Sequence, residues 1–184
     1  MPFALAALAL LLAGSLCLIY RLTVQLGRLQ IRLEKLEPFP QAAVLDGLPR
    51  GSAAPDFELP LIGGGSMRLS AWQGREVLLI FFNPGCAHSL QLAPRFCKLD
   101  AERIDREPIP LIVSTGGPAK NCRLFQGSSI ASRVMLQESF EVSTLYRVRG
   151  TPMGYFINRE HKTGGNVLIG ADTLGFALSA QSLE

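Results

Sequence analysis

A run of six apolar residues, VLLIFF at 77–82, constrains the fold of this chain more than any other feature. A strand with one solvent-exposed face alternates apolar and polar residues, so an unbroken apolar run predicts a strand that is buried on both faces. Helices must then cover both sides of its sheet. A second run of this kind, PLIVS at 110–114, predicts a neighbouring buried strand. Together the two runs indicate an α/β domain.

The segments around these two strands predict a mixed sheet. Residues 55–61 and 66–70 flank three glycines and indicate a hairpin. Further strands are expected at 133–137, 154–158 and 166–170, and helices at 86–105, 119–126, 139–148 and 171–180. Strands that are first separated by helices and later joined by turns indicate a mixed α/β sheet with helices on both faces.

The N-terminal segment has the character of a membrane span. Residues 3–20 contain no charged side chain, and these eighteen residues are about the minimum that crosses a bilayer as a helix. A cleaved signal peptide is the competing interpretation. No Lys or Arg precedes the apolar run, and the run continues past its small residues to 18–20. We therefore favour an uncleaved transmembrane anchor at 1–20.

The segment after the anchor has the spacing of an amphipathic helix. Five leucines recur at intervals of four and three residues, namely Leu22, Leu26, Leu29, Leu33 and Leu36. This is the seam of a coiled coil, although about two heptads are fewer than a secure coiled coil needs. The helical stalk at 21–37 therefore either lies along a surface or forms a weak dimer. Two prolines then end the helix, which leaves 38–51 as a linker and 52–184 as the globular domain.

Charge and composition exclude several functions. The chain has a net charge of +3 from 18 basic and 15 acidic residues, and a surplus of two positive charges falls within 21–37. The body is thus nearly neutral and lacks the basic surface that nucleic acid requires. The four Cys and two His do not have the spacing of a zinc site. No sequence feature indicates a metal or an organic cofactor.

Cys86 is the strongest candidate for chemistry. It follows the turn Asn83-Pro84-Gly85, where a helix is expected to begin. A thiol there meets free backbone N–H groups and the positive end of the helix dipole, and both favour thiolate, the nucleophilic form. His88 and Ser89 lie in the same turn, where an imidazole adds positive charge and a hydroxyl can bond the sulfur. A structural cysteine beside a surface histidine and a capping serine fits these local features equally well.

A wider pattern resembles the thioredoxin fold. The segment 81–89, FFNPGCAHS, is similar to the active-site segment of that family, in which an aromatic strand end precedes Cys-x-x-Cys. Pro94 stands at the position of the family's helix-kinking proline, and Gly150-Thr151-Pro152 resembles its cis-proline loop. The resemblance implies that Cys86 is the nucleophile and that Thr151 and Pro152 position an extended substrate peptide beside it.

The N-terminal features resemble one branch of this fold. Residues 52–70, the anchor and the stalk are similar to the membrane-anchored, redoxin-type branch, which includes the thioredoxin-like protein of methylamine utilisation. The resemblance implies a single-pass protein of a bacterial cytoplasmic membrane, with its domain on the periplasmic or extracytoplasmic side. The basic residues after the apolar run favour the opposite orientation, but long hydrophilic domains cross the membrane despite flanking charge.

The sequence departs from the family's pattern at its second cysteine, which is Ser89 here. In the family the first cysteine attacks a disulfide and the second resolves the mixed disulfide, so this chain would need an external thiol reductant. Ile80 also stands where thioredoxin has a buried acid. We therefore expect monothiol exchange with a protein thiol or disulfide substrate.

Two further cysteines and a histidine lie in the globular domain outside this segment. Cys97 lies about three helical turns beyond Cys86, too far for a disulfide, and is expected in the core. Cys122 follows the strand beside 77–82, and a structural or exposed thiol is the favoured interpretation; the alternative is that it resolves the mixed disulfide if its loop moves. His161 lies in a charged turn and is expected to be solvated.

Two other functions stay open. A thioredoxin fold without its second thiol can be redox-silent and serve as a binding or maturation module, which the reactivity of Cys86 would distinguish. A one-cysteine peroxidase would carry Pro-x-x-x-Thr/Ser-x-x-Cys. Leu79 and Asn83 stand at the proline and hydroxyl positions of that motif, so peroxidase activity ranks lower.

Overall fold

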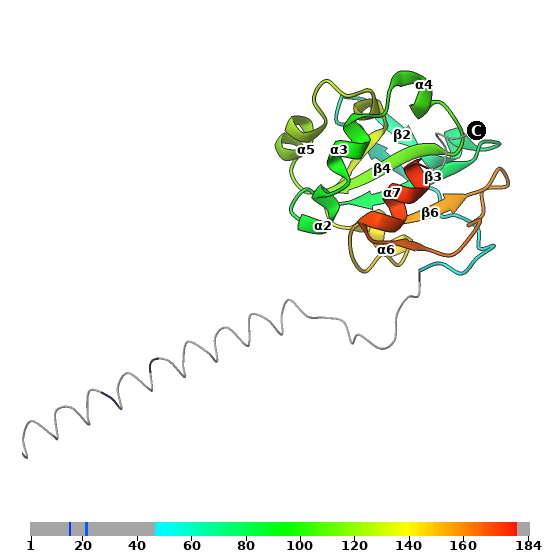
Figure 1. The fold of residues 1–184 in the computed structure, drawn as a ribbon. Helices are drawn as coiled ribbons and strands as arrows, with labels where there is room; N and C mark the ends of the chain where they lie inside the picture. Colours follow the sequence, from blue (N-terminus) through cyan, green and yellow to red (C-terminus); the bar gives the residue numbers. More distant parts are fainter. Residues whose placement is uncertain (1–14, 16–20, 22–46, 180–184) are drawn as a thin grey trace, which may run out of the picture. The chain divides into compact units, whose positions relative to one another are not determined.

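A computed structural model of the protein describes residues 47–179, together with Ser15 and Arg21. The chain divides into two units, Met1–Val44 and Leu45–Glu184, and the fold that follows is that of the second unit (Figure 1). The predicted span and stalk, apart from two residues, lie outside the described part. Among the described residues, no helix combines the length and the apolar character that a membrane crossing requires.

The central sheet has five strands in the order β5-β4-β3-β6-β7. They are β3 (Val77–Phe82), β4 (Ile109–Thr115), β5 (Val134–Gln137), β6 (Met153–Ile157) and β7 (Leu168–Ile169). Strands β3, β4 and β5 run parallel, whereas β6 pairs antiparallel with both β3 and β7. The predicted mixed α/β sheet is confirmed, and its fold is thioredoxin-like.

Strand β3 lies at the centre of the sheet, and all six of its residues are buried. Its side chains alternate between two apolar clusters, one on each face of the sheet. Phe81 packs edge-on against Tyr155 on one face, and Phe82 packs edge-on against Phe96 on the other. The prediction that 77–82 is buried on both faces is therefore confirmed.

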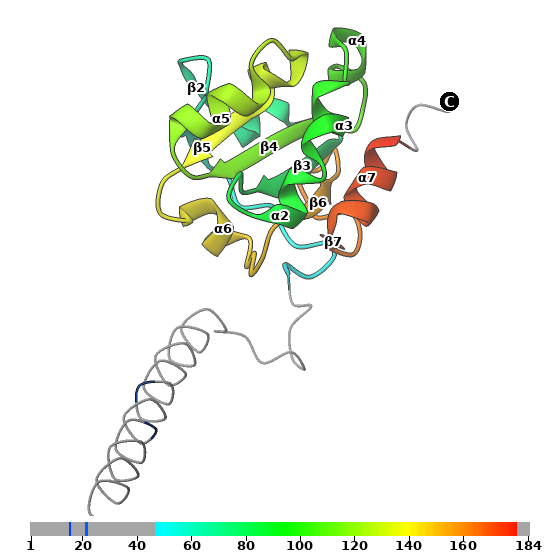
Figure 2. The ribbon, with the colours of Figure 1, turned by 60° about the vertical axis from the view of Figure 1, so that its left-hand side comes forward.

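Helices cover the face of the sheet that Phe82 enters. They are α3 (Ala93–Cys97), α5 (Pro118–Phe125) and α7 (Ala171–Ser179), with the 3-10 helix η2 (Ser129–Arg133) beside them. Figure 2 shows α3, α5 and α7 together in front of the strands. Each contributes apolar side chains to the same buried cluster, which fixes the helices on the sheet.

The opposite face is covered by different elements. Helix α6 (Glu141–Leu145) and the 3-10 helix η1 (Leu69–Trp72) pack there, together with a two-stranded hairpin. The hairpin pairs β1 (Glu58–Pro60) with β2 (Ser66–Arg68) in antiparallel register, as the three glycines between them predicted. A single bridge joins Leu61 to Met135 and so fixes the hairpin to β5.

The single helix predicted over 86–105 is wrong, because the chain forms three short helices there: α2 (Ala87–Leu90), α3 and α4 (Ala101–Ile104). Pro94 lies in the first turn of α3 and has no N–H with which to continue the hydrogen bonds of α2. Asp100 then begins α4 by accepting a hydrogen bond from the backbone N–H of Arg103 at 2.7 Å.

The segment before β1 is bound to the body of the domain. The Tyr155 hydroxyl accepts a hydrogen bond from the Leu48 N–H at 3.1 Å and donates one to the Tyr146 carbonyl at 2.7 Å. The Gly51 N–H bonds to the Thr163 carbonyl at 2.8 Å. The part of the predicted linker that the structure describes therefore packs on the sheet.

Candidate active site

Cys86 lies at the carboxyl edge of the parallel strands, where β3 ends. The turn after β3 is held by Asn83, whose side-chain oxygen accepts from the Gly85 N–H at 2.7 Å and whose carbonyl accepts from the Cys86 N–H at 3.0 Å. Cys86 is the N-cap residue of α2, and its carbonyl accepts from the Leu90 N–H at 3.0 Å. An Asn-Pro-Gly turn thus places the thiol at the start of a helix.

The loop before β6 lies directly beside this thiol. Phe81 pairs with Met153, so the start of β6 adjoins the end of β3. The Thr151–Pro152 peptide bond is cis, as the sequence pattern implied. The Cys86 sulfur donates a hydrogen bond to the Thr151 carbonyl oxygen at 3.1 Å. Residues 65 positions apart in the sequence are thereby brought into contact.

Ser89 lies one helical turn from Cys86, on α2, and is fully buried. Its hydroxyl oxygen accepts a long hydrogen bond, 3.4 Å, from the Asn83 backbone N–H. The same hydroxyl interacts with the Cys86 sulfur and lowers the pKa of the Cys86 thiol. Ser89 therefore joins the turn after β3 to the sulfur, and it offers no nucleophile for a disulfide.

The pKa of the Cys86 thiol lies below its ordinary value. Partial burial raises the pKa, but the backbone N–H of Ser89 and the side chain of Thr151 lower it, with further help from the Ser89 hydroxyl and the His88 N–H. The Thr151 carbonyl accepts from the neutral thiol and opposes this shift. The lowering contributions prevail, so a larger fraction of Cys86 is thiolate than at an ordinary thiol, and thiolate is the nucleophile in thiol–disulfide exchange.

His88 reaches this site through its backbone. The residue is exposed on α2, and the contribution that it makes to the lowered pKa of Cys86 is that of its N–H group. An effect of the imidazole on the sulfur stays a prediction.

Cys122 is not brought to Cys86. It lies on α5, exposed, with its sulfur 3.8 Å from the Ile62 carbonyl. The Ile62 N–H bonds to the Val134 carbonyl, at the first residue of β5 and away from the carboxyl edge that holds Cys86. No disulfide joins Cys86, Cys97 and Cys122, the cysteines that the structure describes.

Two predictions about side-chain exposure are wrong. Cys97 is exposed, because it is the last residue of the short helix α3 and its sulfur lies 3.5 Å from the Leu124 carbonyl, outside the core. His161 is half-buried, with its Nε2 atom covered, because the turn that carries it adopts a left-handed conformation against the segment before β1.

A buried polar network, which was not predicted from the sequence, lies at the same edge of the sheet. The Gln137 amide donates to the Thr115 hydroxyl at 3.0 Å and to the Ser143 hydroxyl at 2.6 Å. Its carbonyl accepts from the Ser143 N–H at 3.0 Å. These bonds join β4 and β5 to α6, which leads into the loop of Thr151. The polar residue at the end of an apolar strand was the signal that could have indicated it.

A second missed residue, Asn121, holds the loop after β4. Its side chain accepts from the Ser114 hydroxyl at 2.6 Å and donates to the carbonyls of Gly116 and Gly117 at 3.4 and 3.3 Å. Gly116 has a φ of +101°, and Pro84 of the active-site turn lies 3.6 Å from where its Cβ would be. This loop therefore supports the turn that carries Cys86.

The fold and the site define a class of protein: a thioredoxin-like domain with a cysteine at a helix start, opposite a cis-proline. The chain belongs to the AhpC/TSA family, whose model matches residues 50–164. No curated protein matches the sequence. Within the described residues, no group of three or more His, Cys, Asp or Glu side chains could hold a metal ion.

Solved structures share this fold. A thiol:disulfide interchange protein of the thioredoxin family from Chlorobium tepidum is 16% identical, with a TM-score of 0.57 over 71% of this chain and 98% of that one. The thioredoxin domain of a thiol-disulfide oxidoreductase from Bacteroides vulgatus is 18% identical, with a TM-score of 0.56 over 73% and 98%. A candidate DsbE interchange protein from Chlorobium tepidum is 23% identical, with a TM-score of 0.58 over 73% and 97%.

Proposed function

We propose that this protein is a membrane-anchored monothiol thiol–disulfide oxidoreductase that acts on a protein substrate. The proposal rests on one observation: the Cys86 sulfur lies 3.1 Å from the Thr151 carbonyl, beside cis-Pro152, while a serine stands one helical turn away at position 89. A thiolate in this place faces backbone against which an extended peptide can pair. The similarity to structures of oxidoreductases and interchange proteins supports a redox role.

The reaction is an exchange between sulfur atoms. The Cys86 thiolate attacks one sulfur of a substrate disulfide, a mixed disulfide forms, and the other substrate sulfur leaves as a thiolate that takes a proton from solvent. Ser89 cannot break the mixed disulfide, so the thiolate of an external thiol attacks it at the substrate sulfur. The bond to Cys86 breaks, Cys86 regains its thiolate, and the substrate leaves as a disulfide with the external thiol.

Apolar side chains beside the site fit a protein substrate. Leu90 and Ile169 are each 42% exposed. The Leu90 N–H bonds to the Cys86 carbonyl and the Gly170 N–H to the Pro152 carbonyl, both at 3.0 Å, so the backbone at Leu90 and at Ile169, the neighbour of Gly170, adjoins the turn of Cys86 and the cis-proline. Exposed apolar surface of this kind favours contact with another protein.

The membrane location is part of the proposal. The apolar segment at 1–20 would anchor the chain in a bacterial cytoplasmic membrane, and the stalk at 21–37 would carry the domain on the extracytoplasmic side, with a weak dimer through its leucines. A membrane-impermeant thiol reagent tests this on intact spheroplasts, because Cys97 and Cys122 are exposed. Labelling before lysis is expected; labelling only after lysis would place the domain in the cytoplasm.

The function is tested by trapping. Membranes that contain the full-length protein are quenched with N-ethylmaleimide, and disulfide-linked partners are separated under non-reducing conditions. Partners linked to the wild type should vanish in Cys86→Ala and persist in Cys97→Ala and Cys122→Ala, the matched controls. A chain that traps no partner and whose Cys86 alkylates slowly is the redox-silent module. Sustained consumption of hydrogen peroxide through Cys86 would indicate the one-cysteine peroxidase.

A further inference from the structure

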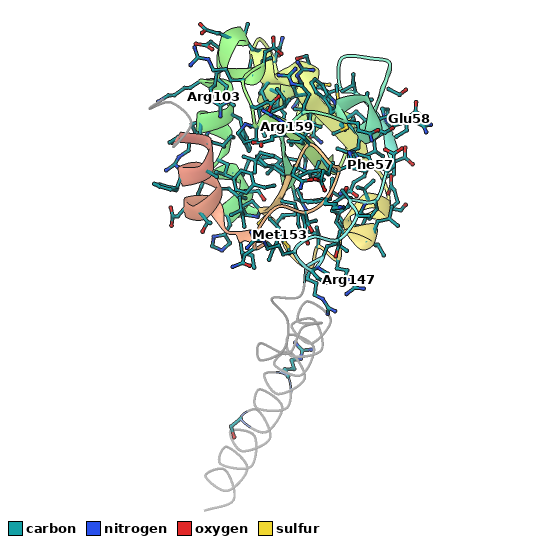
Figure 3. The ribbon with its side chains drawn as sticks, turned by 90° about the vertical axis from the view of Figure 1, so that its right-hand side faces the viewer. Phe57, Glu58, Arg103, Arg147, Met153 and Arg159 are labelled. Atoms are coloured by element: carbon teal, nitrogen blue, oxygen red, sulfur yellow. The ribbon has the colours of Figure 1, made fainter. Side chains whose placement is uncertain are left out.

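A cavity of about 250 Å³ lies beside α4, and six residues line it: Lys98, Leu99, Asp100, Glu102, Arg103 and Arg106. Helix α4 leads into the start of β4, whereas Cys86 lies beyond the end of β3. Figure 3 shows Arg103 at the end of the domain opposite to Met153, the residue that follows the cis-proline. The cavity is therefore separate from the proposed active site.

Arg103 is the unusual side chain of this cavity. It is 8% exposed, and its Nε and Nη2 atoms are buried with no hydrogen-bond partner among the described residues. Its remaining nitrogen, Nη1, donates a long bond of 3.5 Å to the Arg106 carbonyl. The two unpartnered nitrogens form one edge of the guanidinium, the fork that binds two oxygens of a phosphate or carboxylate.

The charges around Arg103 leave this fork without a carboxylate. Asp100 accepts from the Arg103 backbone N–H as the cap of α4, and Glu102 pairs with Arg106. Lys98 is exposed on the rim and has no ion pair among the residues that the structure describes. Burial and the nearby Arg106 lower the pKa of Arg103, Asp100 raises it, and the lowering prevails.

We propose that this cavity binds a phosphate-type oxyanion, with the Nε–Nη2 edge of Arg103 holding two of its oxygens and Lys98 closing the rim. A phosphate monoester carries nearly two negative charges, which suit the neighbouring cations Arg103 and Lys98, whereas a carboxylate carries one. The Nε and Nη2 atoms of Arg103 are buried, so an anion reaches them only when side chains at the rim of the cavity move; Lys98 and Arg106 are the exposed cations of that rim.

The test is a titration of the full-length protein in detergent with inorganic phosphate, at an ionic strength held constant with sodium chloride. Calorimetry should show saturable binding. Arg103→Met should raise the dissociation constant ~10-fold or more, because a charge-assisted pair of bonds is lost. Arg103→Lys keeps the positive charge but lacks the guanidinium fork, so its dissociation constant should lie between those of the wild type and Arg103→Met. Arg123→Met, at an exposed arginine of α5, is the matched control and should bind as the wild type does.

Fold and binding are separated by a second measurement. In buffer without phosphate, Arg103→Met should melt no lower than the wild type, because it removes an unpaired buried charge. If that variant does not fold, Lys98→Gln decides the question through a several-fold weaker affinity for phosphate. Equal phosphate binding by the wild type and Arg103→Met, or no saturable binding by the wild type, would overturn the proposal. Competition by phosphatidic acid added to the detergent micelles, but not by phosphatidylcholine added in the same way, would identify a lipid headgroup as the source of the phosphate.

Discussion

The substitution Ser89→Cys would convert the site into a two-thiol centre. Residues 86 and 89 are the N-cap and third residue of the first turn of α2, so the two side chains face each other across one turn. The new thiol could attack the mixed disulfide at Cys86 within the same molecule. We therefore predict that the parent is nearly inactive in multiple-turnover reduction of a protein disulfide and that the variant is clearly active.

The structure limits the cost of this change. Ser89 is fully buried, and the hydrogen bond that it accepts from the Asn83 N–H is long, 3.4 Å. Weakening one such bond costs about 0.5 kcal/mol, or ~2 °C in melting temperature. The gain is larger, because oriented intramolecular groups reach effective concentrations far above those of millimolar external thiols. We expect turnover to rise by roughly 100-fold, although Ile80, in place of an acid, leaves the new thiol without a nearby base.

The assay follows reduction of insulin disulfides with dithiothreitol as the donor, and Ser89→Ala is the matched control. Ser89→Ala removes the hydroxyl without adding a thiol and should stay inactive. A variant that forms the 86–89 disulfide and still fails to reduce insulin would show that the site is specialised for another substrate. A variant that cannot form this disulfide would refute the placement of Cys86 at the start of α2, and with it the monothiol mechanism.

Three further predictions follow from the contacts. The alkylation rate of Cys86 against pH should give a pKa below the ~8.5 of a free thiol, and Ser89→Ala should raise that pKa more than His88→Ala, which keeps its backbone N–H. Glu107→Gln should lower the melting temperature at neutral pH, because hydrogen bonds from Arg159 and Arg75 hold the pKa of Glu107 below its ordinary value. The carboxylate becomes protonated as the pH falls through this lowered pKa, so the difference between the variant and the wild type should disappear in acid. Tyr155→Phe should cost about 1–3 kcal/mol in urea unfolding, because a buried carbonyl loses its donor.

The sheet was predictable because a strand that is buried on both faces consists of consecutive apolar residues, a pattern that is visible in the sequence. The run at 77–82 therefore identified β3, and the glycines at 63–65 identified the hairpin of β1 and β2. The three short helices after Cys86 were not predictable in the same way. Pro94 is compatible either with one kinked helix or with two separate helices. Asp100 can begin α4 as its N-cap only because α3 ends at Cys97, shortly before it.

The site was predictable where local sequence determines geometry. Cys86 after an Asn-Pro-Gly turn and Pro152 after a threonine were identified from short motifs, and the structure bonds the Cys86 sulfur to the carbonyl of Thr151, the residue before Pro152. The roles of Gln137 and Asn121 were missed, because each depends on partners that tertiary folding places beside it. The exposure of Cys97 was also missed, because a separate short helix α3 that ends at this residue was not predicted.

The central claim is that Cys86 is the nucleophile of a site with one thiol. The most direct measurement is peptide mapping under non-reducing conditions after brief exposure to oxidised glutathione. Cys86, although less exposed than Cys97 and Cys122, should carry a stable glutathione adduct first. Earlier adducts on the two exposed cysteines, or an abundant disulfide between Cys86 and Cys122, would contradict the claim.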